Sequence, residues 1–95
     1  MKTITVEFIG LARILTRQKK LDLQTGQAAT YRDIVQTIGM RFPVLIGQVI
    51  SQTGDELIAS NMINLNGEHM IQEEAMGESP RDGDRIIFMS ILAGG

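Results

Sequence analysis

The chain has 95 residues, a net charge of −2, 43% hydrophobic and 21% charged residues, which is typical of one globular domain over residues 1–95. The absence of cysteine and the single histidine, His69, exclude disulfides, thiolate chemistry and Cys- or His-rich metal sites, and the ten glycines form no nucleotide-binding motif. The slight acidity argues against a nucleic-acid partner, and without a recognisable signal peptide or membrane-spanning apolar run we expect a cytoplasmic protein with no membrane partner.

Two strands are predicted before the main helix. Residues 2–9 alternate apolar and polar side chains, which is typical of a strand that is covered on one face. Gly10 interrupts this alternation, and residues 11–16 are expected to be a connection. A shorter alternation over residues 20–24 predicts a second strand that pairs back on the first.

One long helix is predicted to begin after Thr30. The Thr30 hydroxyl can accept from free backbone amides, and Asp33 completes a capping box near the positive end of the helix dipole. Pro43 ends the helix because the residue before a proline resists the α conformation. An apolar stripe follows helical spacing through Tyr31, Ile34, Val35, Ile38 and Phe42. The helix should therefore lie across one face of a sheet.

The second half of the chain is predicted to be mostly strand. Residues 44–50 form either a short second helix or a turn, and the acidic stretch 72–81 is expected to be irregular. The pair Asn66-Gly67 is a strong hairpin signal. The strands predicted here span residues 61–65, 68–71 and 85–91. The resulting order, β-β-α-β-β-β, indicates an α+β layer pair with the first and last strands at the sheet centre.

Strand parity predicts an apolar group on the face of the sheet that the helix does not cover. If Ile86 and Phe88 face the helix, then Ile87 and Met89 face the other way, and the same counting turns Met62 outward. Overflow from the core is one interpretation. A docking surface for a partner is the other, and we favour it because methionine surfaces adapt to several shapes.

The segment after the final strand is the candidate reactive site. Leu92 and Ala93 lead into Gly94 and Gly95, and neither glycine carries a side chain that would keep this backbone out of a narrow cleft. If extended, these four residues reach about 13 Å beyond the sheet. A frayed chain end is the alternative. Their position directly after an apolar strand favours a carboxylate presented on a thin stalk.

The order of these features resembles the MoaD/ThiS family of ubiquitin-like sulfur carriers. The resemblance covers nearly the whole chain. Its motifs are Phe-Ile-Gly-Leu-Ala-Arg at 8–13, the helical segment 26–43, Asn-Leu-Asn-Gly at 64–67, Asp-Gly-Asp-Arg-Ile at 82–86 and Gly-Gly at 94–95. The family implies a β-grasp fold, in which a mixed sheet of four to five strands has one long helix across one face.

The resemblance further implies that the chain is not an enzyme and binds no cofactor itself. A partner E1-like enzyme would use ATP to adenylate the Gly95 carboxylate, and sulfur would then replace one oxygen to give a thiocarboxylate. Leu92, Ala93 and Gly94 would bind in the channel of that enzyme. The thiocarboxylate would serve a sulfur-accepting synthase large subunit. Molybdopterin synthesis is the first expectation, with thiamine synthesis or another thiolation route as alternatives.

Two departures from the family pattern leave the pathway open. Ser90-Ile91 stand where molybdopterin-synthase members usually have a proline, and residues 72–81 exceed the minimal connection. Two other functions also remain open. A ubiquitin-like modifier would join Gly95 to lysines of target proteins. A binding subunit would insert the same tail into an enzyme without being modified.

Overall fold

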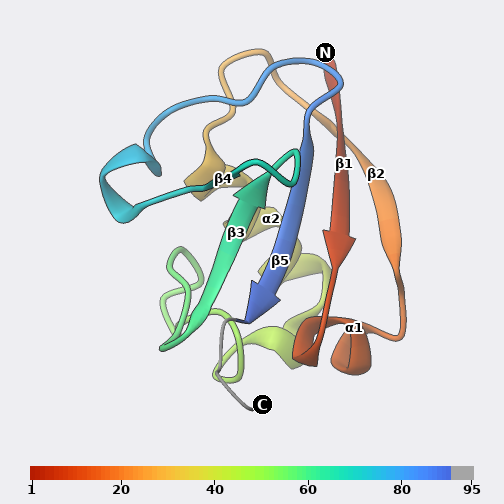
Figure 1. The fold of residues 1–95 in the computed structure, drawn as a ribbon, viewed down its shortest axis with the longest axis vertical. Coiled ribbons are helices and arrows are strands. Elements are labelled where there is room, and N and C mark those ends of the chain that lie inside the picture. Colours follow the sequence, from red (N-terminus) through yellow and green to blue (C-terminus); the bar gives the residue numbers. More distant parts are fainter. Residues whose placement is uncertain (91–95) are drawn as a thin grey trace.

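Five strands form one mixed sheet in the order β2-β1-β5-β3-β4 in the computed structural model, which describes residues 1–90. The strands are β1 (Lys2–Phe8), β2 (Lys20–Thr25), β3 (Asn61–Leu65), β4 (His69–Met70) and β5 (Arg85–Ser90). β1 and β5 run parallel, whereas the other neighbouring pairs are antiparallel. The first and last strands are therefore central, as predicted (Figure 1). Ile91, the predicted last residue of the final strand, lies outside the described residues.

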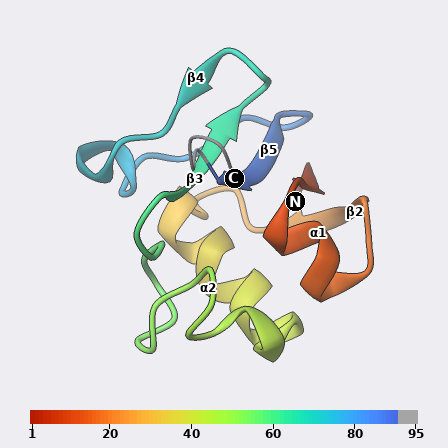
Figure 2. The same ribbon diagram turned by 60° about the horizontal axis from the view of Figure 1, so that its bottom comes forward.

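Helix α2 (Tyr31–Arg41) covers one face of the sheet, as predicted (Figure 2). It begins with a full capping box, in which Thr30 Oγ1 accepts from the Asp33 amide at 3.1 Å and Asp33 Oδ2 accepts from the Thr30 amide at 2.9 Å. The helix ends before Pro43, because Phe42 has left the helical region with φ −127° and ψ 76°. Local sequence therefore defines both ends of α2.

The core lies between α2 and the sheet. Its fully or almost fully buried members include Ile4, Val6, Phe8, Ile34, Ile38, Ile63, Ile86 and Phe88. The Phe8 ring contacts the Phe42 ring edge-on at a centroid distance of 5.5 Å and the Phe88 ring at 5.8 Å. The alternation predicted for the first and last strands therefore identifies the face that packs on the helix.

Residues 11–16 were predicted to be a connection, and that prediction is wrong, because Leu11–Thr16 form a short helix, α1. Gly10 turns the chain out of β1 with φ 68°. Ala12 and Thr16, four residues apart, are buried on one side, and the Thr16 hydroxyl donates to the Ala12 carbonyl at 2.8 Å. Arg17 then ends the helix in the left-handed region. Six residues are too few for helical periodicity to stand out in the sequence.

The remaining segments are short. Residues 44–50, predicted as a helix or a turn, contain the end of a 3-10 turn, η1 (Pro43–Leu45), followed by an isolated bridge between Ile46 and Ile50. The hairpin after Asn66 returns as the two-residue strand β4, shorter than predicted. The stretch 72–81 is irregular apart from a second 3-10 turn, η2 (Glu73–Ala75). Within residues 1–90, no helix is long and apolar enough to cross a membrane.

Candidate partner-binding face

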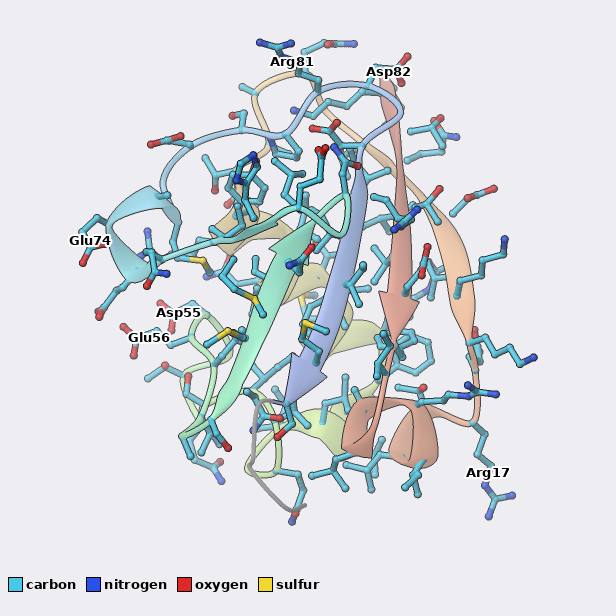
Figure 3. All side chains as sticks on the ribbon, in the orientation of Figure 1. Arg17, Asp55, Glu56, Glu74, Arg81 and Asp82 are labelled. Atoms are coloured by element: carbon cyan, nitrogen blue, oxygen red, sulfur yellow. The ribbon has the colours of Figure 1, made fainter. Side chains whose placement is uncertain are left out.

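The candidate site begins with the face of the sheet that lies opposite α2. The strand register pairs Met62 with Met89 and Asn64 with both Ile87 and Met70, so these five side chains share one face. Their neighbours Ile63, Ile86 and Phe88 are completely buried on the helix side. Methionine sulfur atoms gather over β3 and its neighbours on the viewer's side of the sheet (Figure 3). We call these five residues the methionine face.

The members of the methionine face differ in exposure. Met62, Met70 and Met89 are half-buried, so part of each side chain is open to solvent. Ile87 lies on the predicted face but is only 5% exposed, which corrects the expectation of an open apolar contact there. Its β1 partner Glu7 forms an ion pair with Arg85, and these two long side chains flank it.

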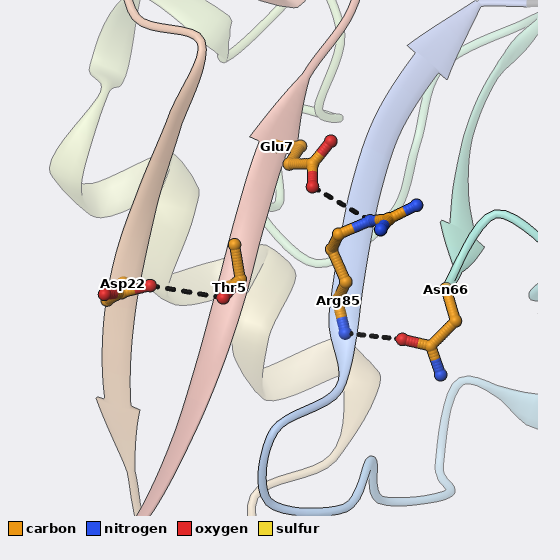
Figure 4. Close-up of polar contacts among 5 residues, drawn as sticks. All are labelled: Thr5, Glu7, Asp22, Asn66 and Arg85. Carbon is orange, nitrogen blue, oxygen red and sulfur yellow. Dashed lines mark hydrogen bonds and ion pairs between the residues drawn. The ribbon is translucent and has the colours of Figure 1, made fainter.

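The half of the same sheet face formed by β1, β2 and the start of β5 is polar and internally paired. The Thr5 hydroxyl donates to Asp22 at 3.2 Å, and Arg85 Nε lies 2.8 Å from Glu7 Oε2 (Figure 4). The backbone amide of Arg85 donates to Asn66 Oδ1 at 2.8 Å (Figure 4). These groups pair with one another, so an apolar partner gains more by covering the methionine face than by covering this half.

Asn64 is a member of the face that sequence reasoning missed. Its side chain is 8% exposed, and its Nδ2 donates to the Met70 sulfur at 3.6 Å. Its Oδ1 is buried and has no hydrogen-bond partner in the described part of the chain. The sequence feature that could have identified Asn64 is a polar residue in the middle of a mostly apolar strand. The alternation of side chains along that strand could not show that apolar neighbours from other strands cover it.

The end of β5 is also flanked by apolar side chains on its β1 side. The Ile9 amide donates to the Phe88 carbonyl at 2.9 Å, which places the start of the α1 region beside the last residues of β5. Ile9 is 45% exposed and Ile14 of α1 is 71% exposed. Arg13, on the same helix, is exposed as well. The predicted reactive residues Leu92, Ala93, Gly94 and Gly95 lie outside the described residues.

A groove of about 220 Å³ borders the methionine face beyond β3. Met62 belongs to both, while the polar rim of the groove includes Arg32 of α2 and Glu73 of η2. The apolar part of its lining comprises Leu57, Met62, Ile71 and Met76. These residues come from separate segments of the chain, so no local sequence motif could predict the groove.

A mixed sheet with a parallel central pair and one helix across one face is the β-grasp fold of ubiquitin-like proteins. The chain belongs to the ThiS family, whose model matches residues 6–95. Members of the ThiS/MoaD family are carriers rather than enzymes, so the prediction of a non-enzymatic protein is confirmed. No curated protein matches the chain.

Several solved structures are similar in fold, and three of them illustrate the range. Small archaeal modifier protein 1 of Haloferax volcanii has a TM-score of 0.80 at 18% identity, covering 97% of this chain and 100% of that one. Urm1 of Trypanosoma brucei has a TM-score of 0.70 at 25% identity, covering 99% and 96%. The complex of subunits 1 and 2 of the molybdopterin-converting factor of Helicobacter pylori contains a chain with a TM-score of 0.62 at 17% identity, covering 98% and 99%. The β-grasp prediction is confirmed.

Proposed function

We propose that this chain carries sulfur as a thiocarboxylate on Gly95, after a partner E1-like enzyme has adenylated that carboxylate with ATP. The observation that carries the proposal is the match to the ThiS family model, which runs through Gly94 and Gly95. The methionine face supports it, because its residue Met89 lies next to the last described residue, Ser90, at the end of β5. Partner contact and reactive group therefore belong to one continuous stretch of chain.

The chemistry needs no side chain from this protein. A Gly95 carboxylate oxygen attacks the α-phosphorus of ATP, pyrophosphate leaves, and the product is an acyl adenylate. The terminal sulfur of a partner's cysteine persulfide then attacks the acyl carbon, and AMP leaves. A second thiol of the partner attacks the resulting acyl disulfide, which forms a disulfide on the partner and releases the thiocarboxylate. The absence of cysteine from this chain fits such a route, because both reacting thiols belong to the partner.

The methionine face is the proposed docking surface for the activating enzyme. Residues 91–95 span at most about 17 Å when fully extended. An active site that holds the Gly95 carboxylate must then lie within that reach of Ser90. We propose that an enzyme so close to the end of β5 covers Met89 and its cross-strand partner Met62. Flexible thioether side chains suit a carrier, which must bind an activating enzyme and later an acceptor.

For the acceptor, we propose a synthase large subunit in molybdopterin synthesis, with thiamine synthesis or another thiolation route as alternatives. The structure from Helicobacter pylori supports this choice, because it is a complex of subunits 1 and 2 of a molybdopterin-converting factor. The Haloferax volcanii structure favours a second candidate, a modifier joined through Gly95 to lysines of other proteins, because that structure is of a small archaeal modifier protein.

Intact-mass spectrometry tests the proposal. The chain is incubated with the adenylating enzyme from the same genome, ATP and a sulfur donor, and reactions without ATP serve as the control. The carrier predicts a mass increase equal to the exchange of one oxygen for sulfur. Ladders of conjugates with other proteins would support the modifier instead. An unchanged mass, with binding to the enzyme retained, would overturn both and leave a binding subunit.

A further inference from the structure

A buried amide lies at the centre of the methionine face. Asn64 sits in β3 with Ile87 opposite it on β5 and Met70 opposite it on β4, while Met62 precedes it on the same face of β3. The residue is only 8% exposed, although α2 packs on the opposite face of the sheet (Figure 2). Apolar side chains therefore surround a polar group on the face that we propose for docking.

The hydrogen bonding of this amide is incomplete. Asn64 Oδ1 has no partner among residues 1–90 and is closed off from solvent, and Nδ2 reaches only the Met70 sulfur, a weak acceptor. Exchanging the amide oxygen and nitrogen does not help, because the nitrogen would then lack an acceptor. A buried amide in this state destabilises the free protein, whereas leucine at the same place would not.

The cover over Asn64 comes from the shortest strand of the sheet. β4 has two residues, and its register with β3 contains two pairs, Asn64 with Met70 and Leu65 with His69. Met70 is half-buried, and its unbranched side chain turns about three bonds. A rotamer change of Met70 would uncover the amide without breaking a backbone pair in β3 or β5.

We propose that Asn64 is a recognition residue for the activating enzyme: Met70 moves aside, and Asn64 Oδ1 accepts a hydrogen bond from an N–H or O–H group within the enzyme's apolar docking surface. This inference rests on the proposed function, which brings that enzyme to the end of β5. A competing protein that offers an apolar group here leaves the amide unpaired and binds less well. Asn64 thus adds selectivity to an otherwise adaptable methionine surface.

The test compares two substitutions at one position. Asn64→Leu keeps the size and removes the acceptor, whereas Asn64→Asp keeps an acceptor oxygen at nearly the same place. Calorimetry with the adenylating enzyme from the same genome should show Asn64→Leu binding about 5- to 100-fold more weakly, the range expected when a buried donor is left unpaired. Asn64→Asp should bind more tightly than Asn64→Leu. Thermal melts should place Asn64→Leu at or above the wild type.

Gln36→Leu is the matched control, because it exchanges an exposed amide for an apolar side chain on α2, outside the methionine face, and its affinity should equal that of the wild type. Pyrophosphate exchange should show a raised KM for Asn64→Leu with kcat unchanged. Wild-type affinity in Asn64→Leu would overturn the proposal, as would equal losses in both Asn64 variants.

Nuclear magnetic resonance supplies a readout that needs no substitution. The side-chain NH₂ signals of Asn64 in the labelled wild-type chain should shift when the enzyme is added, and unchanged signals would contradict the proposal even if Asn64→Leu failed to fold. If the wild type itself neither binds the enzyme nor is adenylated, the proposed function fails. If the wild type is adenylated normally but Asn64→Leu keeps the wild-type affinity, only the inference about Asn64 fails.

Discussion

Lys2 offers a sharp test of how the connection before β5 is fixed. Its side chain is 2% exposed, and its ammonium group donates to three backbone carbonyls: Gln27 at 2.9 Å, Ala29 at 3.2 Å and Pro80 at 2.8 Å. The cation thereby joins the start of β1, the loop before α2 and the irregular stretch before β5. Lys2→Met keeps the unbranched apolar stem and removes all three hydrogen bonds.

The expected loss of stability follows from which carbonyls remain unpaired. The bond to Pro80 is buried, so its oxygen stays without a partner, and such a group costs about 1–3 kcal/mol. The bonds to Gln27 and Ala29 are partly buried, so water can replace part of them, and about 1 kcal/mol is lost there. Relief from burying the ammonium offsets a part of the sum. We expect a net loss of about 2–3 kcal/mol.

Thermal denaturation and urea titration measure this loss. For a domain of this size, a loss of about 2–3 kcal/mol lowers Tm by roughly 10–20 °C. Lys20→Met is the matched control, because the Lys20 side chain is exposed on β2, and it should change the unfolding free energy by less than about 0.5 kcal/mol. A Lys2→Met protein that melts within about 3 °C of the wild type would refute the reasoning, since the three carbonyls would then not depend on the ammonium.

Three further predictions concern the methionine face, the tail and alkaline pH. Met89→Glu should keep the fold and weaken binding to the activating enzyme at least about tenfold in calorimetry, because docking would strand the carboxylate; normal affinity would exclude Met89 from the interface. Deletion of Gly95 should abolish ATP–pyrophosphate exchange while shifting stability by a few tenths of a kcal/mol at most, and full exchange would contradict an activated tail. Burial, and then the carboxylates of Asp84 and Glu78, raise the pKa of Tyr31 above its usual 10.0, so the folded state holds the phenol proton more tightly than the unfolded state does. Stability should therefore fall as pH rises above about 10, and urea titration should show a smaller fall in Tyr31→Phe; equal slopes would exclude Tyr31 as the cause.

The parts of the fold that were predictable are those in which local pattern and tertiary packing agree. The capping box at Thr30 and the proline after Phe42 define α2 without reference to the sheet. Alternation in β1 and β5 identifies the buried face because one side of each strand packs on a helix. The α1 helix was missed for the opposite reason. Its two buried residues, Ala12 and Thr16, are small and carry little apolar signal, while its larger Ile14 faces solvent.

The candidate site was predictable in position but not in detail. Parity placed Met62, Ile87 and Met89 on one face, since successive side chains of a strand alternate. Exposure depends on neighbours that come from other strands. Ile87 is covered because β1 contributes Glu7 beside Arg85, and Asn64 is covered because β4 contributes Met70. The sequence pattern of one strand contains neither pairing. Predicting the burial of Ile87 and Asn64 therefore required the register of the whole sheet.

The division of the sheet face bears on the proposal that this chain binds an activating enzyme and then an acceptor. The polar half, with Thr5, Asp22 and the Glu7–Arg85 pair, is already satisfied and gives a partner little to gain. Under the proposed function, the side chains around Met62 and Met89 then supply most of the contact that the sheet itself offers to a partner. A small adaptable surface discriminates poorly by shape alone. A buried amide such as Asn64 supplies discrimination without enlarging the contact, because a mismatched partner leaves it unpaired while a matched one gains a single hydrogen bond.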